Sequence, residues 1–205
     1  TTIDHLDAIA VGDFRPVNPG LEWCITQEDH AGTSNSWETV LLDSNGVLWA
    51  EETELYTDCE DREPQNIAVG NFDNSRSYAE IWNRSRFNYS EKNGQHPWVF
   101  DNNGTQIADY DMYTKLPDNF SAKLKHGIEN IWTIDWDGSG TEHIAGKARY
   151  GFGHVGIFNA VTGNEVWSTV SLLDTLQAKS FYVADISGDS REEIVLFDLE
   201  DHTIK

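Results

Sequence analysis

The stretch Ile131-Trp-Thr-Ile-Asp-Trp-Asp-Gly-Ser-Gly-Thr-Glu142 runs from an apolar segment into a tight loop with oxygen side chains at alternating positions. The oxygen-bearing residues are Asp135, Asp137, Ser139 and Glu142. Gly138 and Gly140 allow positive φ, so the loop can fold on itself. Such a loop suits Ca²⁺, which takes oxygen ligands, but an Asx-rich turn between two strands fits equally well. It is not an EF-hand, because no Glu occupies position 12 and no helical pattern flanks it.

The stretch recurs along the chain, and this repetition decides the fold class. The related segments are residues 8–14, 66–73 and 181–189, the last followed by the apolar segment 191–197. In chain order, the copies at 8–14, 66–73 and 131–142 are each followed by a predicted hairpin with Asn-Gly or Thr-Gly at its turn. These hairpins are at residues 41–49, 99–107 and 157–167. Four strands per repeat indicate the blades of a β-propeller.

The repeats divide the chain into blades. We expect one all-β, propeller-like domain over residues 1–205, with blades at 1–65, 66–125 and 126–180 and an incomplete one at 181–205. Propellers close with four or more blades, and this chain offers about three and a half. Its open sheet edges are therefore expected to be covered by other subunits or by the rest of a larger chain.

Two loops keep the ligand spacing intact, and we predict calcium at both. The first contains Asp135, Asp137, Ser139 and Glu142, and the second contains Asp185, Ser187, Asp189 and Glu192. In the first blade Arg15 stands where a second carboxylate is needed, so no metal is expected there.

Composition excludes some classes of function. The chain has 35 acidic and 14 basic residues and a formal net charge of −21, which argues against nucleic-acid binding and against unaided binding of any acidic polymer. No apolar run approaches the roughly 18 residues of a membrane span. The segment 151–156 matches GxGxxG, but a strand rather than a helix is expected after it, so a dinucleotide site is rejected.

Sequons and cysteines favour a secreted, extracellular glycoprotein. Four N-glycosylation sequons begin at Asn83, Asn88, Asn103 and Asn119. The two cysteines, Cys24 and Cys59, lie in the first repeat. They form a disulfide in an extracellular protein, and the alternative is two buried thiols.

An ordered series of segments resembles a known family. These segments are 4–14, 19–22, Gln27-Glu28, 79–82, 135–138, Lys147-Ala-Arg149, 183–189 and 191–194. Together they are similar to polysaccharide lyase family 11, the rhamnogalacturonan lyases. This resemblance implies a calcium-rich eight-bladed β-propeller. The Asp-Gly loops alone are shared with FG-GAP-type propellers. The resemblance runs through the whole chain but would cover only part of such a propeller.

The resemblance also implies site residues. By position, His5 matches a family histidine near the catalytic calcium, and Gln27-Glu28 matches a His-Glu pair whose histidine is missing here. β-Elimination needs a neutralised uronate carboxylate and a base for the C5 proton. Calcium held near His5 and Glu28 would neutralise the carboxylate. The candidates for the base are Lys147, Arg149 or His154. The alternatives are a loop hydrogen bond for His5 and blade-edge ion pairs for Lys147 and Arg149.

Two hypotheses follow. The first is a secreted, calcium-stabilised propeller module that lacks catalysis and serves as a structural or carbohydrate-associated protein in an extracellular assembly. The second is one part of a calcium-dependent rhamnogalacturonan lyase acting by β-elimination. We favour the first, because the family histidine is missing and the blade count is incomplete.

Overall fold

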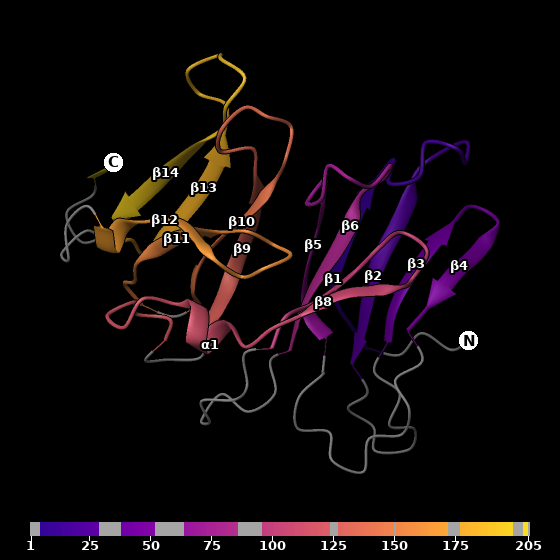
Figure 1. Ribbon diagram of the computed structural model, residues 1–205, viewed down its shortest axis with the longest axis horizontal. Coiled ribbons are helices and arrows are strands. Elements are labelled where there is room, and N and C mark those ends of the chain that lie inside the picture. Colours follow the sequence, from indigo (N-terminus) through magenta and orange to yellow (C-terminus); the bar gives the residue numbers. More distant parts are fainter. Residues whose placement is uncertain are drawn as a thin grey trace, which may run out of the picture.

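The chain is built almost entirely of β-strands (Figure 1). The computed structural model describes residues 5–28, 38–51, 64–85, 96–123, 127–149, 151–171, 177–198 and 203–204. Within them lie four antiparallel sheets, three of four strands and one of three strands. Each sheet consists of strands that follow one another in the sequence. The predicted all-β class with blade-like sheets is confirmed; the division into a single domain with the boundaries given above stays a prediction.

The first two sheets come from the N-terminal half. The first contains β1 (His5–Gly12), β2 (Glu22–Glu28), β3 (Glu38–Asp43) and β4 (Gly46–Ala50). The second contains β5 (Pro64–Gly70), β6 (Glu80–Ser85), β7 (Trp98–Phe100) and β8 (Gln106–Asp109). The β3–β4 turn forms because Asp43 Oδ1 accepts from the amides of Asn45 and Gly46, and Gly46 takes a φ of 135°.

The other two sheets follow a short helical connection. The helix α1 (Met112–Lys115) is a single turn, capped by Asp111, whose side chain accepts from Tyr113 N. The third sheet contains β9 (Ile128–Ile134), β10 (His143–Ala148), β11 (Val155–Phe158) and β12 (Glu165–Ser168), followed by the 3₁₀ turn η1 (Thr169–Ser171). The fourth contains β13 (Ser180–Ala184), β14 (Glu193–Asp198) and β15 (Thr203–Ile204).

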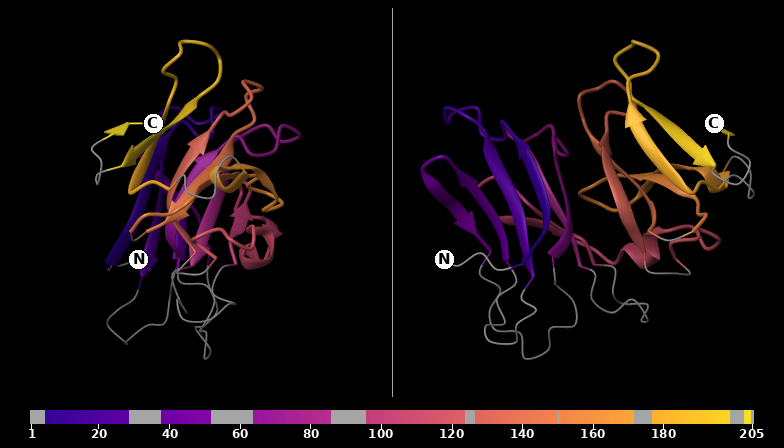
Figure 2. Two further views of the ribbon diagram at one scale, coloured as in Figure 1. Left: turned by 90° about the vertical axis from the view of Figure 1, so that its left-hand side faces the viewer. Right: turned by 180° about the vertical axis from the view of Figure 1, so that it is seen from behind.

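The sheets stand side by side (Figure 2). An apolar layer is buried at each junction. Cys24 and Leu41 meet Ile81 and Trp98 between the first two sheets. Corresponding layers fill the second junction and the third. They contain Trp82, Val99, Ile128, Ile144 and Phe158 in the second, and Ile134, Ala145, Ile157, Phe181 and Leu196 in the third. This is the packing expected of neighbouring blades, because a single four-stranded sheet cannot bury its apolar faces alone.

Adjacent sheets contact through their first strands. β1 lies against β5, β5 against β9, and β9 against β13. The turns that follow these strands all gather at one end of the molecule, at the top of Figure 1. We call this the turn end, and the opposite end, where the first strands begin, the strand-start end. Candidate chemistry lies at both ends.

The predicted disulfide stays a prediction. Cys24 is a buried free thiol, and burial raises the pKa of this thiol to about 12. Cys59 lies outside the described residues. In the described part of the chain, no helix is both long and apolar enough to cross a membrane.

Candidate functional site

Three first strands carry a β-bulge at the same place, close to their start. The pairing register shifts between Leu6 and Ala8 in β1 and between Pro64 and Asn66 in β5. In β9 it skips from Ile128 to Asn130. The extra residues are Asp7, Gln65 and Glu129. A bulge turns its extra side chain out of the alternating pattern, and bulges are common next to binding sites.

These bulge residues line one open pocket of about 340 Å³ at the strand-start end. The remaining lining residues are Asn66, Asn130 and Arg149. Among the described residues, every lining side chain is therefore a carboxylate, a primary amide or a guanidinium. Such a surface suits a ligand rich in hydroxyl and carboxylate groups, because each of these groups can be matched by hydrogen bonds.

Glu129 is the electrostatic centre of the pocket. Its Oε1 lies 3.8 Å from Arg84 Nη1 and its Oε2 lies 3.6 Å from Arg149 Nη1. The Arg84 side chain is 1% exposed, whereas that of Arg149 is 50% exposed. Asn66 fixes the arrangement, since its Nδ2 donates to Glu129 O at 3.2 Å and its Oδ1 accepts from Arg84 Nη1 at 3.5 Å. Arg84 already offsets the charge of Glu129, so the exposed Arg149 can also attract an anionic group.

The residues proposed for catalysis differ in whether they line this pocket. His5 pairs with Glu28 across β1 and β2, which brings their backbones together at the strand-start end. Their side chains lie outside the described part of the structure. Arg149 lines the pocket.

The two other candidate bases are held by the protein itself. Lys147 is fully buried, and its Nζ donates to Ala148 O at 2.6 Å and to Gly151 O at 3.3 Å. His154 is 4% exposed, and its Nδ1 accepts from Ser121 N at 3.1 Å. Neither is among the residues that line the pocket. Both side chains therefore form hydrogen bonds with backbone groups of the protein.

At the turn end, a glutamate at the start of the second strand closes the turn of its own sheet in three of the four sheets. Glu22 Oε2 accepts from the amides of Phe14 and Arg15, and Glu80 Oε2 from those of Phe72 and Asp73. In the fourth sheet, Glu193 Oε2 accepts from the amides of Ile186 and Ser187. The third sheet has His143 at this position. These bonds explain why turns without regular structure keep one shape.

The residue just before this position reaches the neighbouring sheet instead. Glu142 Oε2 accepts from Asn71 N at 2.8 Å, and Glu142 N donates to Asn71 O at 2.8 Å. Glu192 makes the same two contacts with Asp135, at 2.8 and 3.0 Å. The second and third sheets, and the third and fourth, are thus joined at their turns by paired hydrogen bonds.

This arrangement regroups the residues that we predicted as metal ligands. The structure brings Glu192 to the turn of Asp135, and it brings Glu142 to Asn71 rather than to Asp135. Glu193 and His143, which sequence reasoning missed, are the residues of β14 and β10 that follow these two glutamates. Alternation along a strand places neighbouring side chains on opposite faces, and this period of two was the signal that could have identified them.

The turn of Asp135 fits a hard cation better than the turn of Asp185. Asp135 Oδ1 is buried with no hydrogen-bond partner, while Oδ2 accepts from Gly140 N. The side chains of Asp137 and Ser139 accept from Ser139 N and Thr141 N, which leaves further oxygen lone pairs available. Among the described residues, no group of three or more His, Cys, Asp or Glu side chains is arranged to hold a metal. A cation here would need carbonyl, hydroxyl or water ligands as well.

The turn of Asp185 is neutralised by an arginine. Asp189 Oδ2 lies 2.8 Å from Arg191 Nη2. Hydrogen bonds from Arg191 lower the pKa of Asp189 to about 2. Asp185 Oδ1 accepts from Gly188 N, and Ser187 Oγ donates to Glu193 Oε1. The oxygens of this turn already have protein partners, so they fit calcium less well.

The predicted glycosylation sites differ in accessibility. Asn83 is fully buried, and its Oδ1 accepts from Thr39 Oγ1 at 2.9 Å. A glycan on Asn83 would have to displace this contact. Asn103 and Asn119 are exposed, and Asn88 lies outside the described residues.

Comparison with known proteins identifies the fold. No protein-family model matches the chain, and no curated protein is significantly similar to it in sequence. Three solved structures do match. The exotype rhamnogalacturonan lyase YesX superposes with a TM-score of 0.67 at 19% identity, over 98% of this chain and 30% of that protein.

The other two are also rhamnogalacturonan lyases. The Bacillus licheniformis enzyme of family PL11 gives a TM-score of 0.57 at 15% identity, over 92% of this chain and 39% of the enzyme. YesW gives 0.55 at 13% identity, over 94% and 40%. The chain thus spans well under half the length of these proteins, and what it shares with them is the fold of their blade-like sheets.

Proposed function

We propose that this chain is part of a secreted, calcium-stabilised propeller protein related to rhamnogalacturonan lyases, and that it binds an acidic polysaccharide without cleaving it. The polysaccharide lies in the pocket at the strand-start end, with a uronate carboxylate on Arg149. The protein is structural or carbohydrate-associated, in an extracellular assembly whose other parts cover the open sheet edges.

One observation carries this proposal. Of the candidate bases Lys147, Arg149 and His154, only Arg149 lines the pocket. Arginine stays protonated in proteins, so it binds an anion well but cannot remove the C5 proton. The positions of Lys147 and His154, each bonded to nearby backbone, support binding rather than elimination.

In this proposal calcium both reduces the negative charge of the protein and stabilises the turn end. At a net charge of −21 the protein repels an anionic polymer, so bound cations favour the encounter. Calcium would be held by Asp135, Asp137 and Ser139, with carbonyl and water oxygens, where it stabilises the turn end. It would supply charge neutralisation, and the residues at the strand-start end would still do the recognition.

Substitution of Arg149 tests the binding proposal. We expect Arg149→Ala to weaken the binding of rhamnogalacturonan oligosaccharides about tenfold, measured by titration calorimetry in calcium on the intact protein. Arg191→Ala is the matched control, because Arg191 is an exposed arginine at the opposite end. Equal affinities of wild type and Arg149→Ala would contradict the proposal.

The second candidate function is cleavage by β-elimination as part of a larger lyase. The pairing of His5 with Glu28 at the pocket end favours it, since these are the positions expected near a catalytic calcium. Ultraviolet absorbance of unsaturated uronic products separates the two functions. Its appearance with calcium and its loss with EDTA would establish the lyase, and its absence with bound oligosaccharide supports a binding protein.

A further inference from the structure

A second pocket lies at the turn end, between the β5–β6 turn and the β7–β8 turn. Its volume is about 240 Å³. The residues of its wall that matter here are Arg76, Tyr78, Glu80, Asp101, Asn102 and Asn103. It shares no residue with the pocket at the strand-start end.

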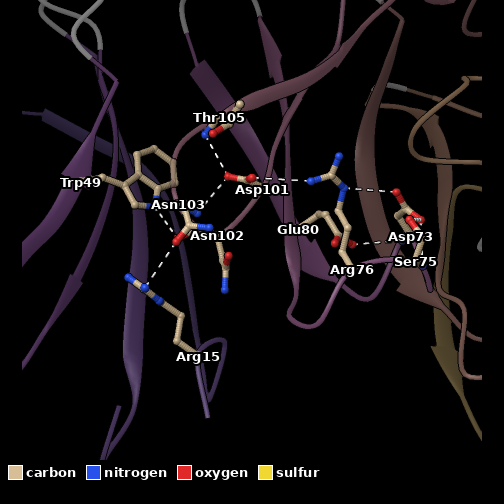
Figure 3. A network of polar contacts seen from close by, with 10 residues as sticks. All are labelled: Arg15, Trp49, Asp73, Ser75, Arg76, Glu80, Asp101, Asn102, Asn103 and Thr105. Carbon is tan, nitrogen blue, oxygen red and sulfur yellow. Dashed lines mark hydrogen bonds and ion pairs between the residues drawn. The ribbon is translucent and has the colours of Figure 1, made fainter. Parts of the chain in front are cut away.

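The charged rim of this pocket is held by its own contacts (Figure 3). Arg76 bridges two carboxylates, with Nε 3.2 Å from Asp73 Oδ2 and Nη1 3.5 Å from Asp101 Oδ2. Asp101 Oδ1 accepts from the amides of Asn103 and Thr105, both at 2.9 Å. The rim is therefore preorganised, and Arg76 already occupies the position where a cation would bind between Asp73 and Asp101.

The adjacent first sheet fixes the other wall. Trp49 Nε1 donates to Asn102 O at 3.0 Å, and Arg15 Nη2 donates to Asn103 Oδ1 at 3.4 Å. Figure 3 shows the Asn102 side chain pointing away from Trp49 and Asp101. The backbone carbonyl of Asn102 and the side chain of Asn103 thus accept hydrogen bonds from the first sheet. The side-chain amide of Asn102 takes no part in these contacts.

Two buried atoms of opposite hydrogen-bonding character remain unmatched. Glu80 is 1% exposed and Asn102 is 5% exposed. Glu80 Oε1 and Asn102 Nδ2 have no hydrogen-bond partner, although Glu80 Oε2 accepts from two amides. Unmatched buried polar atoms destabilise a fold, so native proteins rarely leave them without water or a ligand.

The pair of atoms selects the chemistry of that ligand. An anion is disfavoured by Glu80 and Asp101, and a cation is disfavoured by the N–H donors of Asn102 and by Arg76. A hydroxyl group can match either atom, because it donates one hydrogen bond and accepts others. Tyr78 adds an aromatic ring to the wall, which suits the apolar face of a sugar ring.

We infer that the turn-end pocket binds a neutral sugar residue, whose hydroxyl groups donate to Glu80 Oε1 and accept from Asn102 Nδ2. The pocket volume of about 240 Å³ is below the roughly 300–1,000 Å³ of a drug-sized pocket, so it limits the ligand to about one sugar unit. This site is independent of the polysaccharide pocket around Arg149.

The test exchanges donor and acceptor. The intact protein is screened by saturation-transfer NMR with methyl glycosides of galactose, glucose, mannose, rhamnose and arabinose, and with galacturonate. Glu80→Gln keeps an oxygen for the amides of Phe72 and Asp73 and puts a second donor into the pocket. Asn102→Asp puts in a second acceptor. Each is expected to weaken the best neutral glycoside about tenfold, the effect of one charge-assisted hydrogen bond.

The double variant Glu80→Gln/Asn102→Asp restores one donor and one acceptor and should regain most of the affinity. Glu22→Gln is the matched control, because Glu22 closes its turn as Glu80 does but lies in the first sheet. Its affinity should equal that of the wild type. Binding must also survive Arg149→Ala, which separates this site from the proposed function.

Three results would overturn the inference. The first is that no neutral glycoside binds, in which case the two atoms hold only water. The second is that galacturonate binds Arg149→Ala more tightly than every neutral glycoside does. The third is that the double variant stays as weak as the single ones while melting at the wild-type temperature.

Discussion

Asp189 and Arg191 form an exposed ion pair in the turn of the fourth sheet. The 2.8 Å contact is close, but both side chains are about half exposed, so its effect is seen in titration more than in stability. The pair also explains why an aspartate with calcium-loop spacing does not make the turn of Asp185 a good calcium site.

The pH dependence of this pair has a definite sign. The folded pKa of Asp189, about 2, is below its usual value of 3.8. Its stabilising contribution is therefore present above about pH 4 and is lost as the pH falls towards 2. In Arg191→Gln we expect an NMR titration of Asp189 to move towards its usual pKa. Asp137, whose pKa is lowered by Ser139, should not move.

Glu142 joins the third sheet to the second through one residue. Glu142→Ala removes the acceptor for Asn71 N, and we expect it to lower the free energy of unfolding by about 1 kcal/mol. Urea denaturation measures this change. Glu165→Ala, on an exposed position of β12, is the control and should change stability by less than about 0.5 kcal/mol. A loss of equal size in both variants would contradict the role of Glu142.

At the scale of elements, a buried relay joins strands of two sheets. Trp82 Nε1 of β6 donates to Tyr110 Oη, and Tyr110 Oη donates to Ala160 O after β11, both at 2.8 Å. Burial raises the pKa of Tyr110 well above its ordinary value, so the hydroxyl keeps its proton and stays a donor. Tyr110 thereby ties the segment between the sheets to both of them.

Removing this hydroxyl leaves Trp82 Nε1 and Ala160 O without their partner. Tyr110→Phe should cost about 1–3 kcal/mol of unfolding free energy. Tyr113→Phe is the matched control, since the Tyr113 ring faces Lys123 Nζ at 4.9 Å and its ring is kept. Thermal or urea unfolding of the two variants distinguishes them, and equal stability would show that the relay is not significant.

Over the whole molecule, the turn end and the strand-start end differ in the contacts they make. Turns joined by Glu142 and Glu192 order the sheets, while bulges at the other end collect polar side chains around Glu129. The apolar layers between sheets hold these two ends apart. The calcium prediction concerns the turns of the turn end, so it is testable by melting.

Calcium is expected to raise the melting temperature of the intact protein. A ligand that binds only the folded state stabilises it, so millimolar Ca²⁺ should shift the transition upward relative to EDTA. Asp135→Asn should lose a large part of this shift, and Asp185→Asn should keep most of it, because Asp189 is already paired with Arg191. An unchanged melting temperature in calcium and EDTA would rule out both predicted sites.

Local sequence patterns were sufficient to predict the strands and their grouping. Asn45-Gly46 and the similar turns fix hairpins through local hydrogen bonds and positive φ, which need no distant partner. The repeated apolar segments then predict blade-like sheets. The sets of metal ligands were harder to predict, because the position of a residue in a turn does not show which neighbouring segment its side chain faces.

Which residues meet across sheets depends on the packing of distant segments. Glu142 and Glu192 face the preceding sheet because strand alternation and blade packing turn them there, while Glu193 closes its own turn. Asp7, Gln65 and Glu129 are far apart in the sequence, and they share a pocket because three bulges occur at the same level of adjacent sheets. Local patterns specify local geometry, but a site made across sheets depends on register and packing between segments.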